Sequence, residues 1–310
     1  MSRKLRFDLA VEPNALLCPN PTEFYSKAYI TEDVVENYRP IPGVKSATKV
    51  ANVLFDNVLK ASSCSFSANP QALDAVDIDV CALSAMAELC RFDLEASFVS
   101  LQMAKGSNGD FTVPTFMAYY WDEMAKEIAE EIAILRWKGD KDGDTESFLD
   151  LCDGYEKKFS DDEDILTPAT TAAITSSNVL AEMAKAYALA PGKIRKDKRN
   201  ARLYVSSNVY AAYELAAAAG NTLAYVTESL GEKFLGVKIV VADGMSDNTM
   251  VFTHKDNLIY AFDGEGDGKA LKAVNLEDSV AEPLLRTRTN IKVGFHYTNP
   301  KEIVFYQHTA

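Results

Sequence analysis

Side chains that could act as general bases, nucleophiles or metal ligands are few and scattered along this chain. The sequence contains three histidines, His254, His296 and His308, and each lies in or beside a predicted strand. A histidine on a strand is more often a hydrogen-bonded wall residue than a ligand. None of the three stands in a nucleophile motif with serine or cysteine, and there is no G-x-S-x-G elbow. The sequence therefore predicts no catalytic residues and a protein that is not an enzyme.

The cysteines do not form a recognisable metal or disulfide pattern. They are five in number, at Cys18, Cys64, Cys81, Cys90 and Cys152, with no C-x-x-C pair among them. An odd number without paired spacing argues against a zinc ribbon and against a framework of disulfides. We expect buried or half-buried free thiols in a reducing cytoplasm.

Glycine-rich and acidic turns predict neither a cofactor nor a metal. The turn at 263–268 carries alternating glycines, but no clear helix follows it, whereas a phosphate-binding loop opens a helix. The acidic runs that begin at Asp140 and Asp263 resemble calcium loops, whose twelfth residue is a glutamate. Leu151 and Val274 occupy that position here, so solvated turns are the better interpretation.

Composition and charge are those of an acidic globular protein. The 310 residues include 32 Lys and Arg against 45 Asp and Glu, a net charge of −13, and 47% are hydrophobic. These values exclude a disordered chain, a collagen and a coiled-coil rod. They also argue against a protein that binds nucleic acid over its whole surface, because phosphate binding requires clustered lysine and arginine. The basic run at 193–199 favours a solvated linker, with a contact to phosphate or an acidic neighbour as the alternative.

Neither a targeting signal nor a membrane span is visible in the sequence. Residues 1–6 are basic, but Asp8, Glu12 and Pro13 interrupt the apolar stretch that a signal peptide requires. No run approaches the roughly 18 uninterrupted apolar residues of a membrane span. We expect the protein to stay where it is made, with no membrane partner.

The first 45 residues combine prolines with aromatic side chains. Five of the 11 prolines fall here, and proline fixes φ and cannot donate to a strand ladder, so we expect an extended segment. A disordered tail has few aromatic residues, whereas this segment carries Phe24, Tyr25, Tyr29 and Tyr38. An extended arm that lays these side chains on another surface is the better interpretation.

Residues 46–80 predict a long two-stranded hairpin. Strands at 49–59 and 74–80 flank a tip of small residues. In the second strand valine and isoleucine alternate with aspartate, the period of a strand with one solvated face. A lone hairpin is marginal in water, so its apolar face needs a partner.

The arm and the hairpin are therefore both expected to bury apolar side chains on copies of the same chain. Obligate interfaces of this kind commonly bury about 2,000–5,000 Å². The candidate inter-subunit contacts are aromatic residues of the arm and apolar residues of the hairpin, namely Phe24, Tyr25, Tyr29, Tyr38, Val53, Phe55, Val58, Phe66, Val76, Ile78 and Val80.

The strongest predicted element is a helix at Pro114–Lys138. Its apolar residues recur every three or four positions and form one continuous stripe, with glutamates off the stripe. Proline is tolerated in a first helical turn, and Gly139 is suited to the position after the last one. At about 1.5 Å a residue, the helix spans roughly 35 Å.

The remaining pattern mixes helices with antiparallel strands and has no βαβ rhythm, which is typical of the α+β class. We expect helices at 82–90, 177–190 and 208–219, and strands at 203–206, 233–242, 249–254 and 257–262. The chain is expected to end in a hairpin formed by 291–297 and 303–306.

Five stretches occur in an order that indicates a family. The first is the helical stretch at 114–140, which ends in W-x-G-D. The others are FLDLCDG at 148–154, a strand and helix at 203–216, strands at 234–263 and returning strands at 286–306. Together they resemble the major capsid proteins of tailed bacteriophages, of the Hong Kong ninety-seven type, in which the first stretch is the spine helix.

The resemblance implies an α+β capsid fold in four parts. They are an N-terminal arm at 1–45, an extended β-hairpin loop at 46–80 that lies over a neighbouring subunit, a peripheral domain at 81–147 and 275–310 with spine helix 114–138, and an apical domain at 148–274.

The resemblance further implies a structural protein of the virion. It would self-assemble into hexamers and pentamers of an icosahedral phage head that encloses double-stranded DNA, after synthesis in the bacterial host cytoplasm. Further copies of the chain are the main partners, with portal, scaffold and decoration proteins beside them, and the packaged DNA is held by weak non-specific contact. Because the arm is short, we expect the scaffold to be a separate protein or absent.

Two alternatives stay open at this point. The same fold forms the shells of bacterial nanocompartments, although no cargo-docking segment is evident in the sequence. A small-ligand-binding α+β enzyme is less favoured, because the clustered His, Cys or Gly motifs that it would need are missing. Some relatives also cross-link their shells through Lys–Asn bonds, for which Lys60 is a conceivable donor without an evident partner.

Overall fold

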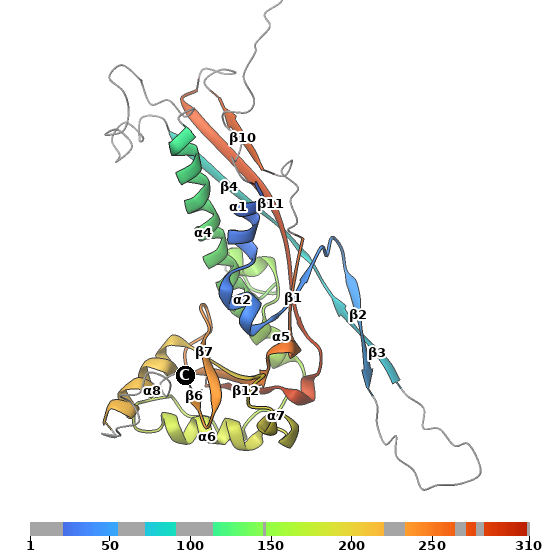
Figure 1. The fold of residues 1–310 in the computed structure, drawn as a ribbon, viewed down its shortest axis with the longest axis vertical. Coiled ribbons are helices and arrows are strands. Elements are labelled where there is room, and N and C mark those ends of the chain that lie inside the picture. The colour runs from blue at the N-terminus through green and yellow to red at the C-terminus, as the bar shows by residue number, and fades with distance from the viewer. Residues whose placement is uncertain are drawn as a thin grey trace, which may run out of the picture. The chain divides into compact units, whose positions relative to one another are not determined.

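The computed structural model confirms the α+β class. The residues that the structure describes are 21–54, 72–90, 114–144, 147–219, 233–263, 271–276 and 282–308. The chain divides into two compact units, the first formed by Met1–Ala28, Ser84–Ile128 and Glu265–Ile291, and the second by Tyr29–Leu83, Ala129–Gly264 and Lys292–Ala310. Figure 1 colours the elements in chain order, from blue at the N-terminus to red at the C-terminus.

The first unit packs helices against one face of a small sheet. Its described elements are α1 (Pro21–Tyr29), the second part of β4 (Cys81–Cys90), the first part of α4 (Pro114–Lys138), β10 (Lys272–Asn275) and the first part of β11 (Leu284–Tyr297). Strand β11 pairs with both β10 and β4. The Trp121 ring packs edge-on against Phe24 at 5.6 Å, and the hydroxyls of Tyr120 and Thr287 are 2.7 Å apart.

Helix α4 has the bounds that its apolar stripe predicts. Met124 of the predicted stripe is half-buried, and its other members are buried, namely Met117, Trp121, Ile128, Ile132 and Leu135. The helix ends where the Gly139 amide donates to the Leu135 carbonyl at 3.0 Å. A Cβ on residue 139 would collide with the backbone oxygen of Cys152, so only glycine permits this close approach.

The larger sheet of the second unit is buried on both faces. Its strand order is β12 (Val304–Gln307), β8 (Thr249–His254), β5 (Ala201–Val205), β7 (Val237–Val241) and β6 (Lys233–Phe234). Helices α6 (Val179–Leu189) and α8 (Ser207–Ala219) pack against it, as Figure 1 shows. Leu203 and Val205 of β5 join the core under these helices, whereas Tyr204 between them meets Trp137 on the opposite face.

The second unit also contains strands β1 and β9. Strand β1 (Arg39–Pro42) runs parallel to β9 (Leu258–Phe262), which pairs antiparallel with the second part of β11. The remaining short helices are α2 (Glu32–Asn37), η2 (Phe148–Leu151), α5 (Tyr155–Asp161), α7 (Gly192–Lys196), η4 (Lys255–Asn257) and η5 (Pro300–Glu302).

The predicted hairpin is confirmed as an antiparallel pair. Strand β2 (Thr48–Leu54) pairs with β3 (Ala72–Ile78), from Thr48 opposite Ile78 to Leu54 opposite Ala72. The first strand is described only as far as Leu54, and the predicted tip lies outside the described residues. Figure 1 shows the two strands side by side.

The helix predicted at 82–90 is wrong, because this segment is strand β4. Exposed and half-buried residues alternate along it, with Ser84 and Met86 exposed and Leu83 and Ala85 half-buried. Alanine, leucine and glutamate favour a helix in isolation, but pairing with β11 outweighs that local preference.

Three other predictions need correction in the C-terminal half of the chain. The terminal hairpin does not form, because β11 pairs with β9 whereas β12 pairs with β8. The single strand predicted at 233–242 is two strands, joined by a turn with Leu235 and Gly236 at positive φ. The basic run is not a simple linker, because it begins within helix α7, where Ile194 is buried.

The arm is also less extended than its prolines predict. Residues 21–37 fold into α1 and α2, and Pro21 opens α1 at a position where its missing amide proton is not needed. Pro40 and Pro42 lie in β1, which among the described strands pairs only with β9. None of the helices in the described ranges is long and apolar enough to cross a membrane.

Candidate functional site

The root of the β2–β3 hairpin is anchored in a small apolar cluster of the second unit. Ile78 at the end of β3 is completely buried, together with Val44, Ile259 and Ala261. Val80 packs half-buried against the same cluster. Ile78 of β3 therefore finds cover on β9 of the same chain where the hairpin begins.

The backbone after β3 passes very close to β11. A Cβ on Gly294 would stand 2.5 Å from the Asp79 carbonyl oxygen, so glycine is required at this crossing. The segment before β2 is held as well, because the Val44 amide donates to the Phe262 carbonyl at 3.2 Å. Lys292 Nζ donates to the Lys45 carbonyl at 2.9 Å. Both ends of the hairpin are thus fixed at its root.

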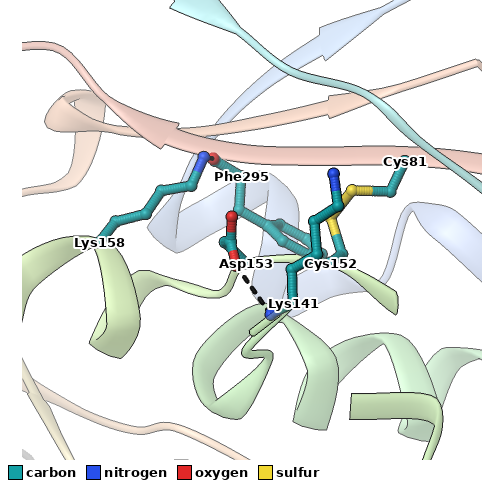
Figure 2. Close-up of a disulfide and its surroundings, with 6 residues drawn as sticks. All are labelled: Cys81, Lys141, Cys152, Asp153, Lys158 and Phe295. Atoms are coloured by element: carbon teal, nitrogen blue, oxygen red, sulfur yellow. Dashed lines mark hydrogen bonds between the residues drawn. A yellow bond between two sulfur atoms is a disulfide. The ribbon is translucent and has the colours of Figure 1, made fainter. Parts of the chain in front are cut away.

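A disulfide adds a covalent link at the same place. Cys81, the first residue of β4, is bonded to Cys152 directly after η2, with an S–S distance of 2.00 Å and 5.8 Å between the two Cα atoms (Figure 2). The prediction of free thiols is wrong for this pair. Cys90 is a free thiol, whereas Cys18 and Cys64 lie outside the described residues.

A polar recess of about 440 Å³ opens beside the disulfide. It is lined by Ala47, Asp79, Val80, Cys81, Ala82, Lys141, Leu151, Cys152, Asp153 and Lys158. The Lys141 amide donates to Asp153 Oδ1 at 2.9 Å, and Lys158 Nζ donates to the Phe295 carbonyl at 2.7 Å (Figure 2). Burial lowers the pKa of Lys158, and the nearby Asp153 and Asp79 carboxylates oppose that shift. The lining includes two lysines and two aspartates, so its formal charges balance.

Buried aromatic residues fix the arm inside the second unit. Tyr38, between α2 and β1, lies 5.5 Å from the Tyr204 ring and 6.2 Å from the Tyr155 ring, centroid to centroid. The guanidinium of Arg136 stands 4.2 Å from the centre of the Tyr38 ring and pairs with Asp33 at 3.4 Å. Burial raises the pKa of Tyr38 well above its ordinary value, so its hydroxyl stays neutral.

The four aromatic contact candidates of the arm are covered by their own chain. Phe24 and Tyr25 are each 4% exposed in the first unit, and Tyr29 and Tyr38 are 1% and 2% exposed in the second. Tyr29 stacks on Phe262 at 5.6 Å. The argument that these rings need a sister molecule for cover is therefore wrong, and a role for them in contacts between subunits stays a prediction.

The hairpin candidates divide between buried, half-buried and undescribed side chains. Ile78 is buried in its own chain, and Val76 and Val80 are half-buried. Val53 lies in β2, but its side chain is outside the described set, as are all of Phe55, Val58 and Phe66. A role in contacts between subunits stays a prediction for each of them.

The histidines are spread over the second unit and each has a hydrogen-bond partner. His254 Nε2 lies 3.0 Å from Asp197 Oδ2, and His308 Nδ1 lies 3.5 Å from the Thr171 hydroxyl. His296 Nδ1 accepts from the Tyr297 amide at 2.8 Å. Within the described ranges, no three His, Cys, Asp or Glu side chains gather in a way that could hold a metal ion.

The acidic run at Asp140 gathers around a lysine. Lys157 Nζ lies 3.7 Å from Asp140, 3.8 Å from Asp142 and 3.6 Å from Asp161. These carboxylates raise the pKa of Lys157, so its ammonium group stays charged. Lys157 thus supplies a counter-charge to the described part of this run.

No protein-family model matches the sequence, and no curated protein matches it either. Solved structures, by contrast, match over nearly the whole chain. A chain of the satellite phage P4 procapsid that includes the size determination (Sid) protein has a TM-score of 0.58 at 9% identity, over 92% of this chain and 96% of that chain. A chain from the capsid of the empty GTA particle has a TM-score of 0.57 at 16% identity, over 99% and 100%. This protein has a phage major capsid fold. A capsid-fold chain of Mycobacterium phage Ogopogo matches at 0.53 and 13% identity, over 88% and 90%.

The capsid fold confirms the resemblance that five ordered stretches indicated in the sequence. At identities of 9–16% the agreement is one of fold rather than of conserved side chains. The disulfide is the feature of this capsid fold that sequence reasoning missed. Cys81 and Cys152 are 71 residues apart with no paired spacing, so only the three-dimensional fold brings them together.

Proposed function

We propose that this protein is the major capsid protein of a tailed bacteriophage. Copies of the chain assemble into hexamers and pentamers, and these close into an icosahedral head around double-stranded DNA. The observation that carries the proposal is the capsid fold, which extends over 92% of this chain against the P4 procapsid and 99% against the GTA capsid. The role is structural and not catalytic.

We propose that the subunit divides into four parts. Residues 1–45 are the arm and 46–80 the extended loop. Residues 81–147 and 275–310 make up the peripheral domain, with α4 as its spine, and 148–274 the apical domain. The anchored root at Ile78 and Cys81 supports this assignment, because a loop that lies on a neighbour must be held firmly where it leaves its own subunit.

Surface side chains of the first unit support a role in assembly. Met86 on β4 is 70% exposed and Val274 on β10 is 50% exposed, and both line one groove. Lys272, Arg286 and Arg288 border that groove together with Glu88, which pairs with Arg286. Three basic side chains against one acidic side chain around apolar residues suit contact with another copy of a chain whose net charge is −13.

The proposed partners beyond the chain itself are a portal, a scaffold and decoration proteins. Packaged DNA is held by weak non-specific contact, since the acidic chain repels phosphate overall. Assembly takes place in the bacterial host cytoplasm, and the product is part of the virion.

The test is to express the full chain and examine it by analytical ultracentrifugation and negative-stain electron microscopy. We expect closed shells with five-fold and six-fold capsomers. Shells that carry a specific protein cargo and form without scaffold or portal would favour a nanocompartment instead. A compact, solitary 34.1 kDa species that binds a small ligand would contradict the proposal and favour the enzyme alternative.

A further inference from the structure

The Cys81–Cys152 bridge ties the root of the hairpin to a segment that the chain reaches 71 residues later. Without it, the root is held by non-covalent contacts, chiefly the burial of Ile78 and the close approach of Asp79 to Gly294. These contacts do not depend on the oxidation state of sulfur. The bridge is therefore a restraint that can be made or removed on a root that is already folded.

The recess beside the bridge gives small molecules access to it. Cys152 is only 2% exposed, whereas Cys81 is half-buried, and both line the recess of about 440 Å³. Thiol–disulfide exchange requires that an attacking sulfur reach one of the two partners. Because Cys81 is the more exposed of the two, it is the partner that we expect a small thiol or disulfide to meet first, and Cys152 is the buried partner that acts second.

We propose that Cys81 and Cys152 form a redox clasp on the root of the β2–β3 hairpin. In a reducing compartment the chain carries two thiols, and it closes the bridge when it meets a low-molecular-mass disulfide such as oxidised glutathione. The Cys81 thiolate attacks that disulfide, which forms a mixed disulfide and releases one thiolate. The Cys152 thiolate then displaces the second thiolate, and the two thiol protons leave with the two released thiols. Two cysteines are oxidised and one small disulfide is reduced, and excess thiol reverses the reaction.

The inference about when the clasp closes rests on the proposed capsid function. A capsid assembled in a host cytoplasm is made under reducing conditions and later meets an oxidising exterior. The clasp would then be open while subunits assemble and closed in the released particle. The chemistry of the pair does not depend on assembly, because both cysteines belong to one chain.

The first experiment tests whether the pair changes state. The full chain is incubated with reduced or oxidised glutathione, alkylated, and digested without further reduction for mass spectrometry. We expect a cross-linked peptide containing Cys81 and Cys152 after oxidation, and alkylation of both cysteines after reduction. Alkylation of both cysteines after oxidation, or a bridge that excess thiol leaves intact, would overturn the proposal.

The second experiment tests whether the bridge restrains the hairpin. We expect amide hydrogen exchange in β2 and β3 to be several-fold slower in the oxidised protein than in the reduced protein. Cys90→Ser keeps the pair and should respond like the wild type, whereas Cys81→Ser should exchange equally fast in both conditions. The comparison of the two redox forms of the wild type stands even where Cys81→Ser fails to fold. Equal amide exchange in the oxidised and reduced forms would contradict the proposed clasp.

The outcomes separate the clasp from the proposed function. Sedimentation of the same samples reports assembly independently of exchange. A chain that shows the redox-dependent exchange but forms no shell would contradict the capsid function and leave the clasp standing. Shells in which amide exchange of the hairpin is the same with reduced and oxidised glutathione would contradict the clasp and leave the capsid function standing.

Discussion

Gly139 shows how a single missing side chain sets the geometry at the end of α4. Its amide closes the helix on Leu135, and its α-carbon faces the backbone oxygen of Cys152, too close for any Cβ. The Gly154 amide donates to the Gly139 carbonyl at 2.8 Å, which fastens the two backbone segments to each other. Cys152, whose carbonyl oxygen approaches Gly139, is also the buried partner of the disulfide.

We predict that Gly139→Ala destabilises the fold strongly. The new methyl group would collide with the carbonyl oxygens of Cys152 and Leu135, so the backbone there must move away from it. We expect the free energy of unfolding to fall by roughly 2–4 kcal/mol in a urea titration. Gly192→Ala is the matched control, because a Cβ at the start of α7 meets nothing within 4 Å. It should change the free energy by no more than about 1 kcal/mol. Equal effects of the two substitutions would contradict this account.

The buried Glu156 gives the second unit a pH dependence. Its Oε1 accepts a hydrogen bond from the Ser246 amide at 2.7 Å, and the residue is 8% exposed. Burial raises its pKa above the ordinary value of 4.5, while the Ser246 contact and Lys138 oppose the shift. A carboxyl group with a raised pKa binds its proton more tightly in the folded state than in the unfolded state. Its contribution to stability is thus fully present below pH 4.5 and is lost as pH rises through the folded pKa.

We predict that Glu156→Gln removes this part of the pH dependence. Glutamine keeps an acceptor oxygen for Ser246 but carries no charge, so the variant should gain stability over the wild type as pH rises from 4 to 8. Urea unfolding at several pH values measures the difference. Glu163→Gln, at an exposed site, should track the wild type throughout. A constant difference between Glu156→Gln and the wild type across this range would refute the argument.

At the scale of elements, the sequence predicts what local periodicity specifies and misses what distant pairing decides. The stripe of α4 lies within one segment, and its bounds were predictable to the residue. β4 was not predictable, because its alternation becomes meaningful only beside β11, about 200 residues later, where Ser84 Oγ donates to Asn290 Oδ1 at 2.9 Å. Loop closure over such distances leaves no local signal.

The same distinction applies to the candidate site. Strand alternation correctly placed Ile78 on the apolar face of the hairpin, but its cover came from Val44 and Ile259 of the same chain. The Cys81–Cys152 pair carried no spacing signal at all. The aromatic rings of the arm were recognised as anchors, and their partners could not be recognised, because Trp137, Tyr155 and Tyr204 are contributed by three different elements.

We predict that Ile78→Ala loosens the root of the hairpin. The side chain is fully buried between β3 and β9, so truncation leaves a cavity and should cost about 2–4 kcal/mol in the free energy of unfolding. Amide exchange in β2 and β3 should rise as well. Met86→Ala removes a side chain of similar size that is 70% exposed and should change stability by less than about 0.5 kcal/mol. If Ile78→Ala left hairpin exchange unchanged, the apolar cluster would not be what holds the root.

At the scale of the whole molecule, charge rather than packing governs contact with nucleic acid. The net charge of −13 repels phosphate at long range. The basic run at 193–199 is partly occupied by the protein itself, because Lys193 Nζ lies 2.6 Å from Glu302 Oε1 and Lys198 Nζ donates to the Leu235 carbonyl at 2.7 Å. Phosphate would have to compete with these groups at Lys193 and Lys198, whereas Arg195, Lys196 and Arg199 of the run are exposed.

We therefore predict that the purified protein binds a short DNA duplex only weakly. In gel shifts at about 150 mM salt the dissociation constant should be no tighter than roughly 10⁻⁴ M, with binding visible only at low salt. Glu302→Gln frees Lys193, so it should steepen the dependence of log K on log salt by up to about one unit, the effect of one additional phosphate contact. Lys301→Gln, at the exposed neighbouring position, removes a positive charge and should not strengthen binding. Tight binding by the wild type that persists at high salt would mean that a basic surface outside these contacts dominates, against the balance of the whole chain.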